Sequence, residues 1–150
     1  MHEPTAWLQS ETPQPPPPEP STNPGPESSP AVPRILVVDD ERLIADTLAT
    51  ILNHNGFSAS AAYNGEEAIV AARDLQPDIV LSDVLMPKMS GVELGIRLRS
   101  ELPRTRILLF SGQAATSELM RKAQADGHDF ELFPKPIHPD ELIAKLKAHW

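Results

Sequence analysis

Short hydrophobic runs alternate with amphipathic segments along residues 34–150, and this pattern predicts five strands and five helices. The runs are rich in branched side chains, which is typical of buried strands. They cover residues 35–38, 57–62, 79–81, 107–110 and 130–133. Between and after them, hydrophobic residues recur every three or four positions, which is typical of helices. These segments cover residues 40–54, 64–74, 91–101, 116–125 and 140–150.

Strict alternation of strands and helices favours parallel strands joined by right-handed crossovers, with helices on both faces of the sheet. In a unit of about 117 residues, we expect an α/β fold with a doubly wound five-stranded parallel sheet flanked by five helices. The usual strand order at this size is 2-1-3-4-5, the flavodoxin-like arrangement.

Residues 1–33 differ in composition from the rest of the chain. They hold 11 of the 17 prolines and four Glu but no Lys or Arg, so they carry −4 of the formal charge of −8. Trp7, Leu8 and Val32 are too few large hydrophobic side chains to offset the entropy of ordering. We expect a disordered Pro-rich tail at 1–33 and one folded domain at 34–150. A docking peptide around Trp7 and Leu8 and a misassigned start site are the alternatives.

Composition excludes several classes of protein. Without Cys there is no disulfide framework, thiolate zinc site, iron–sulfur cluster or Cys nucleophile. No hydrophobic run approaches the ~18–20 residues of a membrane span, and the first residues lack the basic and apolar regions of a signal peptide. The pI near 5.0 and the lack of a basic cluster argue against a nucleic-acid surface. We expect a cytoplasmic domain that binds neither nucleic acid nor membrane.

Polar side chains stand where the predicted strands end. Asp39 and Asp40 follow the first strand, and Asp83 follows the third. Ser111 follows the fourth strand and Lys135 follows the fifth. Ligands of doubly wound sheets bind at the carboxyl ends of the strands, near the point between strands 1 and 3 where the order reverses. We therefore expect three carboxylates, a hydroxyl and an ammonium to converge there.

Three carboxylates in one crevice raise one another's pKa values, and Mg²⁺ relieves this repulsion while leaving ligand positions for water and phosphoryl oxygens. A carboxylate is also an accepted nucleophile for phosphorus. The set therefore favours a Mg²⁺-dependent phosphoryl-transfer site, in which Lys135 and Ser111 bind phosphoryl oxygens. Taken singly, Asp39 and Asp40 could be helix caps, Ser111 a turn residue and Lys135 a solvated surface charge.

Four motifs in order carry a resemblance to a known family. They are ILVVDDE at 35–41, DVLMPKMSG at 83–91, FSG at 110–112 and KP at 135–136. The chain resembles a bacterial two-component response-regulator receiver domain over residues 34–150, and we expect no output domain after it. The resemblance implies a stand-alone receiver or a phosphorelay intermediate. Its role would be signal transduction without turnover of an external substrate.

The resemblance also implies a role for each acidic residue. Asp83 would be the phosphoacceptor, and the donor would be the phosphohistidine of a sensor histidine kinase or a histidine phosphotransfer protein. Asp40, Asp83 and the Leu85 carbonyl would bind Mg²⁺ directly, and Asp39 would act through water.

Lys135 would pair with the phosphoryl group, and its bond to Pro136 is expected to be cis. Ser111 would be the switch hydroxyl, moving toward the phosphate. The fourth helix, the fifth strand and the fifth helix would then change a surface that an unknown downstream protein reads. A weak homodimer is left open.

The chain departs from the family pattern near the switch and near the phosphoacceptor. Leu132 stands three residues before the Lys, where the family usually has Tyr or Phe. Either Phe130 or Phe133 substitutes for it, or no aromatic switch operates. Leu85 and Gln113 stand at the two positions that usually govern dephosphorylation. Leu85 cannot orient a water molecule, whereas Gln113 has a carboxamide that could, and we expect slow self-dephosphorylation.

Two other classes of function compete with this interpretation. The first is a phosphatase or phosphotransferase that uses Asp83 on small molecules. Such enzymes typically carry a second Asp two residues after the nucleophile, where this chain has Leu85. The second is a binding module that ignores phosphate, and the presence of all five polar residues argues against it.

Overall fold

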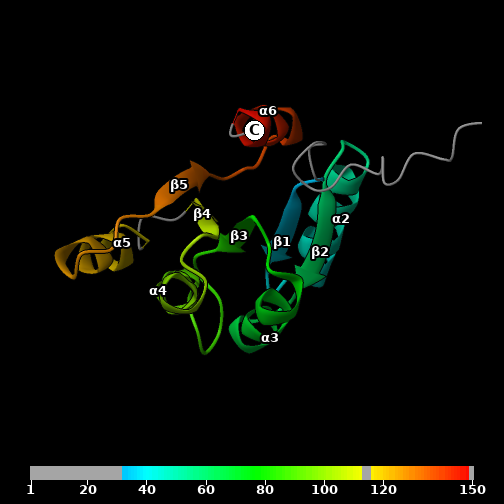
Figure 1. Ribbon diagram of the computed structural model, residues 1–150. Helices are drawn as coiled ribbons and strands as arrows, with labels where there is room; N and C mark the ends of the chain where they lie inside the picture. The colour runs from blue at the N-terminus through cyan, green and yellow to red at the C-terminus, as the bar shows by residue number, and fades with distance from the viewer. Residues whose placement is uncertain (1–31, 113–115, 149–150) are drawn as a thin grey trace, which may run out of the picture. The chain divides into compact units, whose positions relative to one another are not determined.

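Five parallel strands lie in the order β2-β1-β3-β4-β5 in the computed structural model, which describes residues 32–112 and 116–148 (Figure 1). The strands are β1 (Arg34–Val38), β2 (Ser58–Ala62), β3 (Ile79–Asp83), β4 (Arg106–Ser111) and β5 (Glu131–Pro134). The helices, labelled as in Figure 1, are α2 (Arg42–Asn53), α3 (Gly65–Leu75), α4 (Gly91–Glu101), α5 (Thr116–Ala125) and α6 (Pro139–Lys147). The predicted doubly wound α/β fold and its strand order are confirmed.

Each central strand contributes side chains to two hydrophobic cores. In β1, Ile35 and Val37 pack in the core under α2 and α6, while Leu36 and Val38 pack in the core under α3 and α4. Figure 1 shows these two helix pairs on opposite sides of the sheet. Because successive side chains of a strand point to opposite faces, a strand covered on both faces must be hydrophobic throughout. This explains the uninterrupted run at 35–38.

The last strand begins one residue later than the sequence pattern predicts. Phe130 precedes β5 and is buried in the core under α4, where its ring lies 4.1 Å from the guanidinium carbon of Arg99. Phe133 lies on β5 and is buried in the opposite core. The two phenylalanines thus pack in opposite cores, and the predicted range 130–133 is corrected to Glu131–Pro134.

The first helix begins at Arg42, two residues after the predicted start at Asp40. The cause is a local turn, in which the backbone N–H of Glu41 donates to Asp39 Oδ1 at 2.9 Å. The turn keeps Asp39 and Asp40 outside the helix, at the end of β1. The last helix begins one residue before the predicted start, at Pro139, and ends at Lys147, with Ala148 as its C-cap; residues 149–150 lie outside the described part of the chain.

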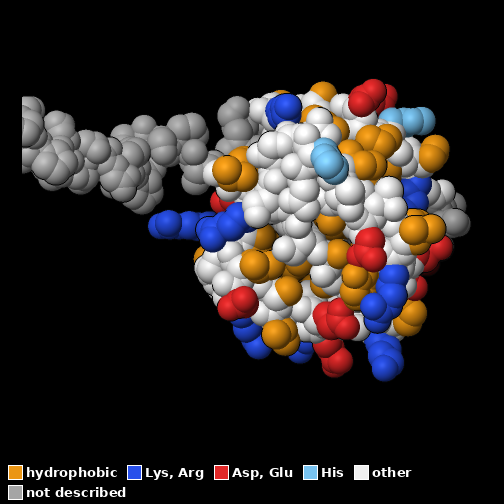
Figure 2. Space-filling view, turned by 90° about the vertical axis from the view of Figure 1, so that its right-hand side faces the viewer, with side chains coloured by type: hydrophobic (Ala, Val, Ile, Leu, Met, Phe, Trp, Pro, Cys, Tyr) orange, Lys and Arg blue, Asp and Glu red, His pale blue; other side chains and the backbone are white. Residues whose placement is uncertain are grey.

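The expected tail at 1–33 lies outside the described residues except for Val32 and Pro33. The Pro33 carbonyl accepts a hydrogen bond from the Ser58 N–H at 2.8 Å, which extends the pairing of β1 with β2. On the face of the domain seen in Figure 2, acidic, basic and hydrophobic side chains are interspersed. Within the described residues, no helix is long and apolar enough to cross a membrane.

Candidate functional site

Three carboxylates meet where β1 and β3 end. β1 and β3 are paired neighbours, with Val38 opposite Ser82, so the residues that follow these positions lie side by side. One carboxylate oxygen from each of Asp39, Asp40 and Asp83 lies within 4.8 Å of the other two. Asp39 and Asp83 are buried and Asp40 is exposed, which makes the cluster a crevice with one open side.

Asp39 is fully buried, and its two oxygens have different surroundings. Oδ1 accepts the Glu41 N–H, whereas Oδ2 has no hydrogen-bond partner among the described residues. The pKa of Asp39 is raised to about 6, chiefly by burial; the charges of Asp83 and Asp40 also raise it, whereas the Glu41 N–H and Lys135 lower it. A buried carboxylate oxygen without a partner is costly unless a donor or a cation satisfies it.

Asp83 shares the crevice with an ammonium group. Lys135 Nζ lies 3.3 Å from Asp83 Oδ1. Burial raises the pKa of Asp83, and the Asp40 charge raises it as well, while Lys135 and the Leu85 N–H lower it. The pKa of Asp83 is raised overall, so the ammonium offsets only part of the cost of burying this carboxylate.

The loop after β5 places Lys135 beside the end of β4. The Lys135 N–H donates to the Ser111 carbonyl at 3.1 Å, which continues the pairing of the two strands. Its peptide bond to Pro136 is cis. Ser111 is the last residue of β4 and is buried. Ser111 thus ends β4 beside β3, the strand that ends in Asp83, and Lys135 reaches the Asp83 carboxylate from the end of the next strand.

The remaining predicted site residues lie around this crevice or outside the described part of the chain. The Leu85 side chain is 41% exposed in the loop after β3. Leu132 is 43% exposed on β5, whereas Phe130 and Phe133 are buried. Gln113 lies outside the described residues.

Gly91 has a positioning role that the sequence pattern does not reveal. It begins α4, and its N–H donates to the Val84 carbonyl at 2.8 Å. A Cβ atom at this position would collide with the backbone carbonyl of Asp83. The start of α4 therefore packs directly against the backbone of Asp83. A sequence alone shows Gly91 only as part of a helix start, because the contact joins two elements.

The donor set fits a small hard cation. It consists of carboxylate oxygens, one of them buried without a partner, and Mg²⁺ prefers such ligands. An ammonium beside the cluster is suited to an anion bound at the same place. A divalent cation would balance the negative charge that the three carboxylates carry in excess of the ammonium, and the cation and the ammonium could then bind a phosphoryl group between them.

The fold and the acidic crevice define the class of receiver-type phosphoacceptor domains, and the comparison with known proteins agrees. The family model described as "Response regulator receiver domain" matches residues 35–147. The chain belongs to this family. It is therefore a receiver domain of two-component response regulators, a phosphoacceptor signalling module.

Similar proteins include curated mycobacterial regulators and solved receiver structures. The chain is 36% identical over 114 residues to the probable transcriptional regulatory protein TcrX of Mycobacterium tuberculosis, covering 76% of this chain and 48% of TcrX. It is 36% identical over 115 residues to the response regulator MprA of Mycobacterium sp. (strain KMS), covering 77% of this chain and 49% of MprA. The chain thus spans about half the length of the curated relatives that it matches.

Two solved structures illustrate the structural similarity. The chemotaxis protein CheY4 of Vibrio cholerae superposes with a TM-score of 0.67 at 28% identity, covering 79% of this chain and 98% of CheY4. A two-component transcriptional regulator AraC of Clostridium phytofermentans superposes with a TM-score of 0.64 at 33% identity, covering 77% of this chain and 90% of that one.

Proposed function

We propose that Asp83 is the phosphoacceptor and that phosphorylation requires Mg²⁺ at the carboxylate cluster. The observation that carries this proposal is the position of the Asp83 carboxylate between Lys135 Nζ at 3.3 Å and the two neighbouring carboxylates. A buried carboxylate with an ammonium on one side and a cation-binding cluster on the other is arranged for attack on a phosphoryl group.

Asp40, Asp83 and the Leu85 carbonyl would hold the Mg²⁺, with Asp39 acting through water. When bound, the ion neutralises negative charge on the phosphoryl oxygens. The Asp83 carboxylate oxygen attacks phosphorus, the new O–P bond forms, and the P–N bond to the donor histidine breaks. Lys135 would pair with a second phosphoryl oxygen, and the Ser111 hydroxyl would donate a hydrogen bond to the third.

The donor in this proposal is the phosphohistidine of a sensor histidine kinase or a histidine phosphotransfer protein. Beside Lys135, an apolar groove of about 440 Å³ runs between α2 and the segment after β5. Leu43 of α2 is 79% exposed at this groove, and Pro136 and Ile137 form its other side. We assign this groove to the donor, because a protein seated there reaches the crevice past Lys135.

The output surface in this proposal is formed by α5, β5 and α6, which are the fourth helix, fifth strand and fifth helix of the domain. Leu132 is exposed on β5, three residues before Lys135. A change at Ser111 and Lys135 on phosphorylation would alter how β5 presents Leu132 to a downstream protein. The proposal includes no turnover of an external substrate.

The first test is incubation with acetyl phosphate and Mg²⁺ followed by intact-mass analysis. We expect wild type to gain one phosphoryl group and Asp83→Ala to gain none. Asp74→Ala is the matched control, because Asp74 is an exposed carboxylate on α3, outside the cluster. Equal labelling of Asp83→Ala would overturn the assignment of Asp83. Multiple turnover of a small phosphomonoester would instead indicate a phosphatase.

A further inference from the structure

The FSG motif at the end of β4 contacts Lys135 at its backbone, at its stem and at its ammonium group. The Ser111 carbonyl accepts the Lys135 N–H at 3.1 Å. A Cβ atom at Gly112 would lie 3.1 Å from the Lys135 Cβ, so the lysine stem begins close to this glycine. The Lys135 Nζ lies over the Phe110 ring, 5.4 Å from the ring centre. Consecutive residues of β4 therefore guide this side chain from its base to its end.

Phe110 lies beside Asp83 on the same face of the sheet. The two residues are partners in the register of β3 and β4. Leu81, two positions before Asp83, packs with Phe110 in the core under α2 and α6, and side chains two positions apart in a strand share a face. An ammonium group over the Phe110 ring is therefore next to the Asp83 carboxylate. This agrees with the distance of 3.3 Å from Lys135 Nζ to Asp83 Oδ1.

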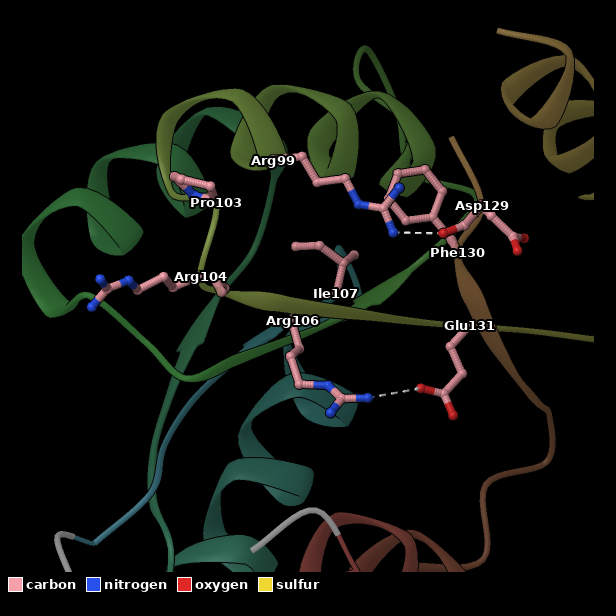
Figure 3. A pocket seen from close by; sticks show the side chains of 9 residues that line it. Arg99, Pro103, Arg104, Arg106, Ile107, Asp129, Phe130 and Glu131 are labelled. Carbon is pink, nitrogen blue, oxygen red and sulfur yellow. Dashed lines mark hydrogen bonds and ion pairs between the residues drawn. The ribbon is translucent and has the colours of Figure 1, made fainter. Parts of the chain in front are cut away.

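Two other cations lie over aromatic rings in the described part of the chain, and neither forms an ion pair with the carboxylate cluster there. The guanidinium carbon of Arg42 lies 4.2 Å from the centre of the Tyr63 ring, and that of Arg99 lies 4.1 Å from the centre of the Phe130 ring. Figure 3 shows the Arg99 guanidinium and its hydrogen bond to the Asp129 backbone carbonyl. The contact of Lys135 differs from both, because its cation takes part in the proposed chemistry.

A lysine side chain needs support to stay in one place. Its four-carbon stem is flexible, and fixing the rotamers has an entropic cost. The Lys135 side chain is 29% exposed, so water competes for the ammonium on its open side. Phe110 is buried, and an aromatic face attracts a cation more strongly where water is partly excluded. The ring therefore favours the position beside Asp83 over positions in open water.

We propose that Phe110 is a positioning residue for Lys135, whose ring face keeps the ammonium beside Asp83 ready for a phosphoryl group. The part of this inference that concerns the phosphoryl group rests on the function proposed above, whereas the placement of the ammonium does not. A leucine at this position fills similar space without an aromatic face, so it would leave the ammonium held by Asp83 alone.

The test measures the mobility of Lys135 and the rate of phosphorylation in the full chain. Relaxation of ¹³C in the lysine ε-methylene groups reports how ordered each side chain is. We expect Lys135 to be more ordered than Lys147, which is exposed on α6, and to become more mobile in Phe110→Leu. Labelling by acetyl phosphate with Mg²⁺ should slow about fivefold, the equivalent of one cation–π contact.

A fluorinated ring separates the charge effect from packing. Pentafluorophenylalanine at position 110 keeps the ring shape but reverses the charge of its face, so it should loosen Lys135 and slow labelling as the leucine does. Phe57→Leu is the matched control, because Phe57 is buried in the same core but precedes β2, at the opposite edge of the sheet from β5. It should leave the order of Lys135 unchanged.

Unchanged order of Lys135 in both Phe110 variants would overturn the proposal. A loss of order in Phe110→Leu that the fluorinated ring does not reproduce would also overturn it, because the ring would then act by packing alone. An equal loss in Phe57→Leu would do the same. If wild type is not labelled but Lys135 loosens in both Phe110 variants, the positioning by Phe110 is supported and only the proposed phosphorylation fails.

Discussion

At the scale of single residues, the Lys135 ammonium opposes the effect of burial on the charge of Asp83. Burial raises the pKa of Asp83 and Lys135 lowers it, with 3.3 Å between the two groups. We predict that Lys135→Gln raises the pKa of Asp83 further, because the carboxylate loses its nearest positive charge. A ¹³C NMR titration of the Asp83 carboxyl carbon measures the change, and labelling by acetyl phosphate at neutral pH should slow down.

Lys145→Gln is the control for this experiment. Lys145 of α6 pairs with Glu131 at the start of β5, and no ion pair between Lys145 and Asp83 occurs among the described residues. Its replacement should leave the titration of Asp83 unchanged. An unaltered Asp83 titration in Lys135→Gln would show that the ammonium does not act on this carboxylate in solution.

Leu85 provides a second prediction at the residue scale. Its exposed apolar side chain follows Asp83 by two positions and cannot hold a water molecule for attack on an acyl phosphate. We predict that phosphorylated wild type is long-lived without a phosphatase and that Leu85→Asn shortens its lifetime, because a carboxamide can orient water. The decay is followed by intact mass, with Val70→Asn on α3 as an exposed control. A wild-type half-life of seconds would contradict the prediction.

The site residues that can be predicted from the sequence are those at the ends of strands. Asp39, Asp83 and Ser111 each terminate or follow a hydrophobic run, so the periodic pattern places them at one edge of a parallel sheet. The exposed position of Leu132 and the burial of Phe130 depend on contacts with other elements. No periodicity encodes such contacts.

At the scale of elements, β5 shows why part of the fold could not be predicted. Phe130 and Phe133 begin and end the short hydrophobic run from which this strand is predicted. In the structure, Phe130 leaves the strand to pack against Gly95 and Arg99 of α4, and only Phe133 stays in it. Tertiary packing decides this boundary, whereas the buried strands β1, β3 and β4 are fixed by their own composition.

The contact between α4 and β3 gives a prediction at the element scale. We predict that Gly91→Ala destabilises the domain by about 1–3 kcal/mol, because the new methyl group meets the Asp83 carbonyl and forces the helix or the strand end to move. Urea unfolding measures the loss. Labelling of Asp83 by acetyl phosphate should fall as well, since the phosphoacceptor shifts with its backbone.

Ser100→Ala is the matched control in the same helix. Ser100 is exposed on α4, and alanine is a better helix former than serine. The control should therefore be as stable as wild type or slightly more stable. Equal stability of Gly91→Ala and wild type would show that α4 does not need to approach β3 this closely.

At the scale of the whole molecule, the two cores share the central strands, so the site is a property of the complete sheet. Asp39 and Asp40 follow β1 and Asp83 ends β3, while Ser111 ends β4 and Lys135 follows β5. Packing of α2 and α6 on one face and of α3 and α4 on the other holds these strand ends in register. Because Asp39 and Asp83 are buried in this sheet, their ionisation affects the free energy of unfolding of the whole domain.

The raised pKa of Asp39 determines how the stability of the folded domain changes with pH. Its pKa is about 6 in the folded state and near 3.8 in the unfolded chain. Between these values the folded state holds a proton that the unfolded state lacks, so stability decreases as the pH rises from about 4 to 6. Above pH 6 the ionised, buried carboxylate costs about 3 kcal/mol, the equivalent of the shift in pKa.

We predict that Asp39→Asn removes this cost and also removes part of the response to Mg²⁺. Asparagine keeps an oxygen for the Glu41 N–H but carries no charge, so the metal-free variant should be more stable than wild type at pH 7 and equally stable near pH 4. Mg²⁺ should raise the melting temperature of wild type more than that of the variant. This difference should grow as the pH rises through 6, because the ion competes with the proton on Asp39. Thermal unfolding across pH with EDTA or with Mg²⁺ measures both effects.

A variant that is less stable than wild type at pH 7 in EDTA would show that Asp39 contributes favourable contacts that outweigh its buried charge. The carboxylate would then be a structural element of the β1 end rather than a group kept ionised at a cost for the cation.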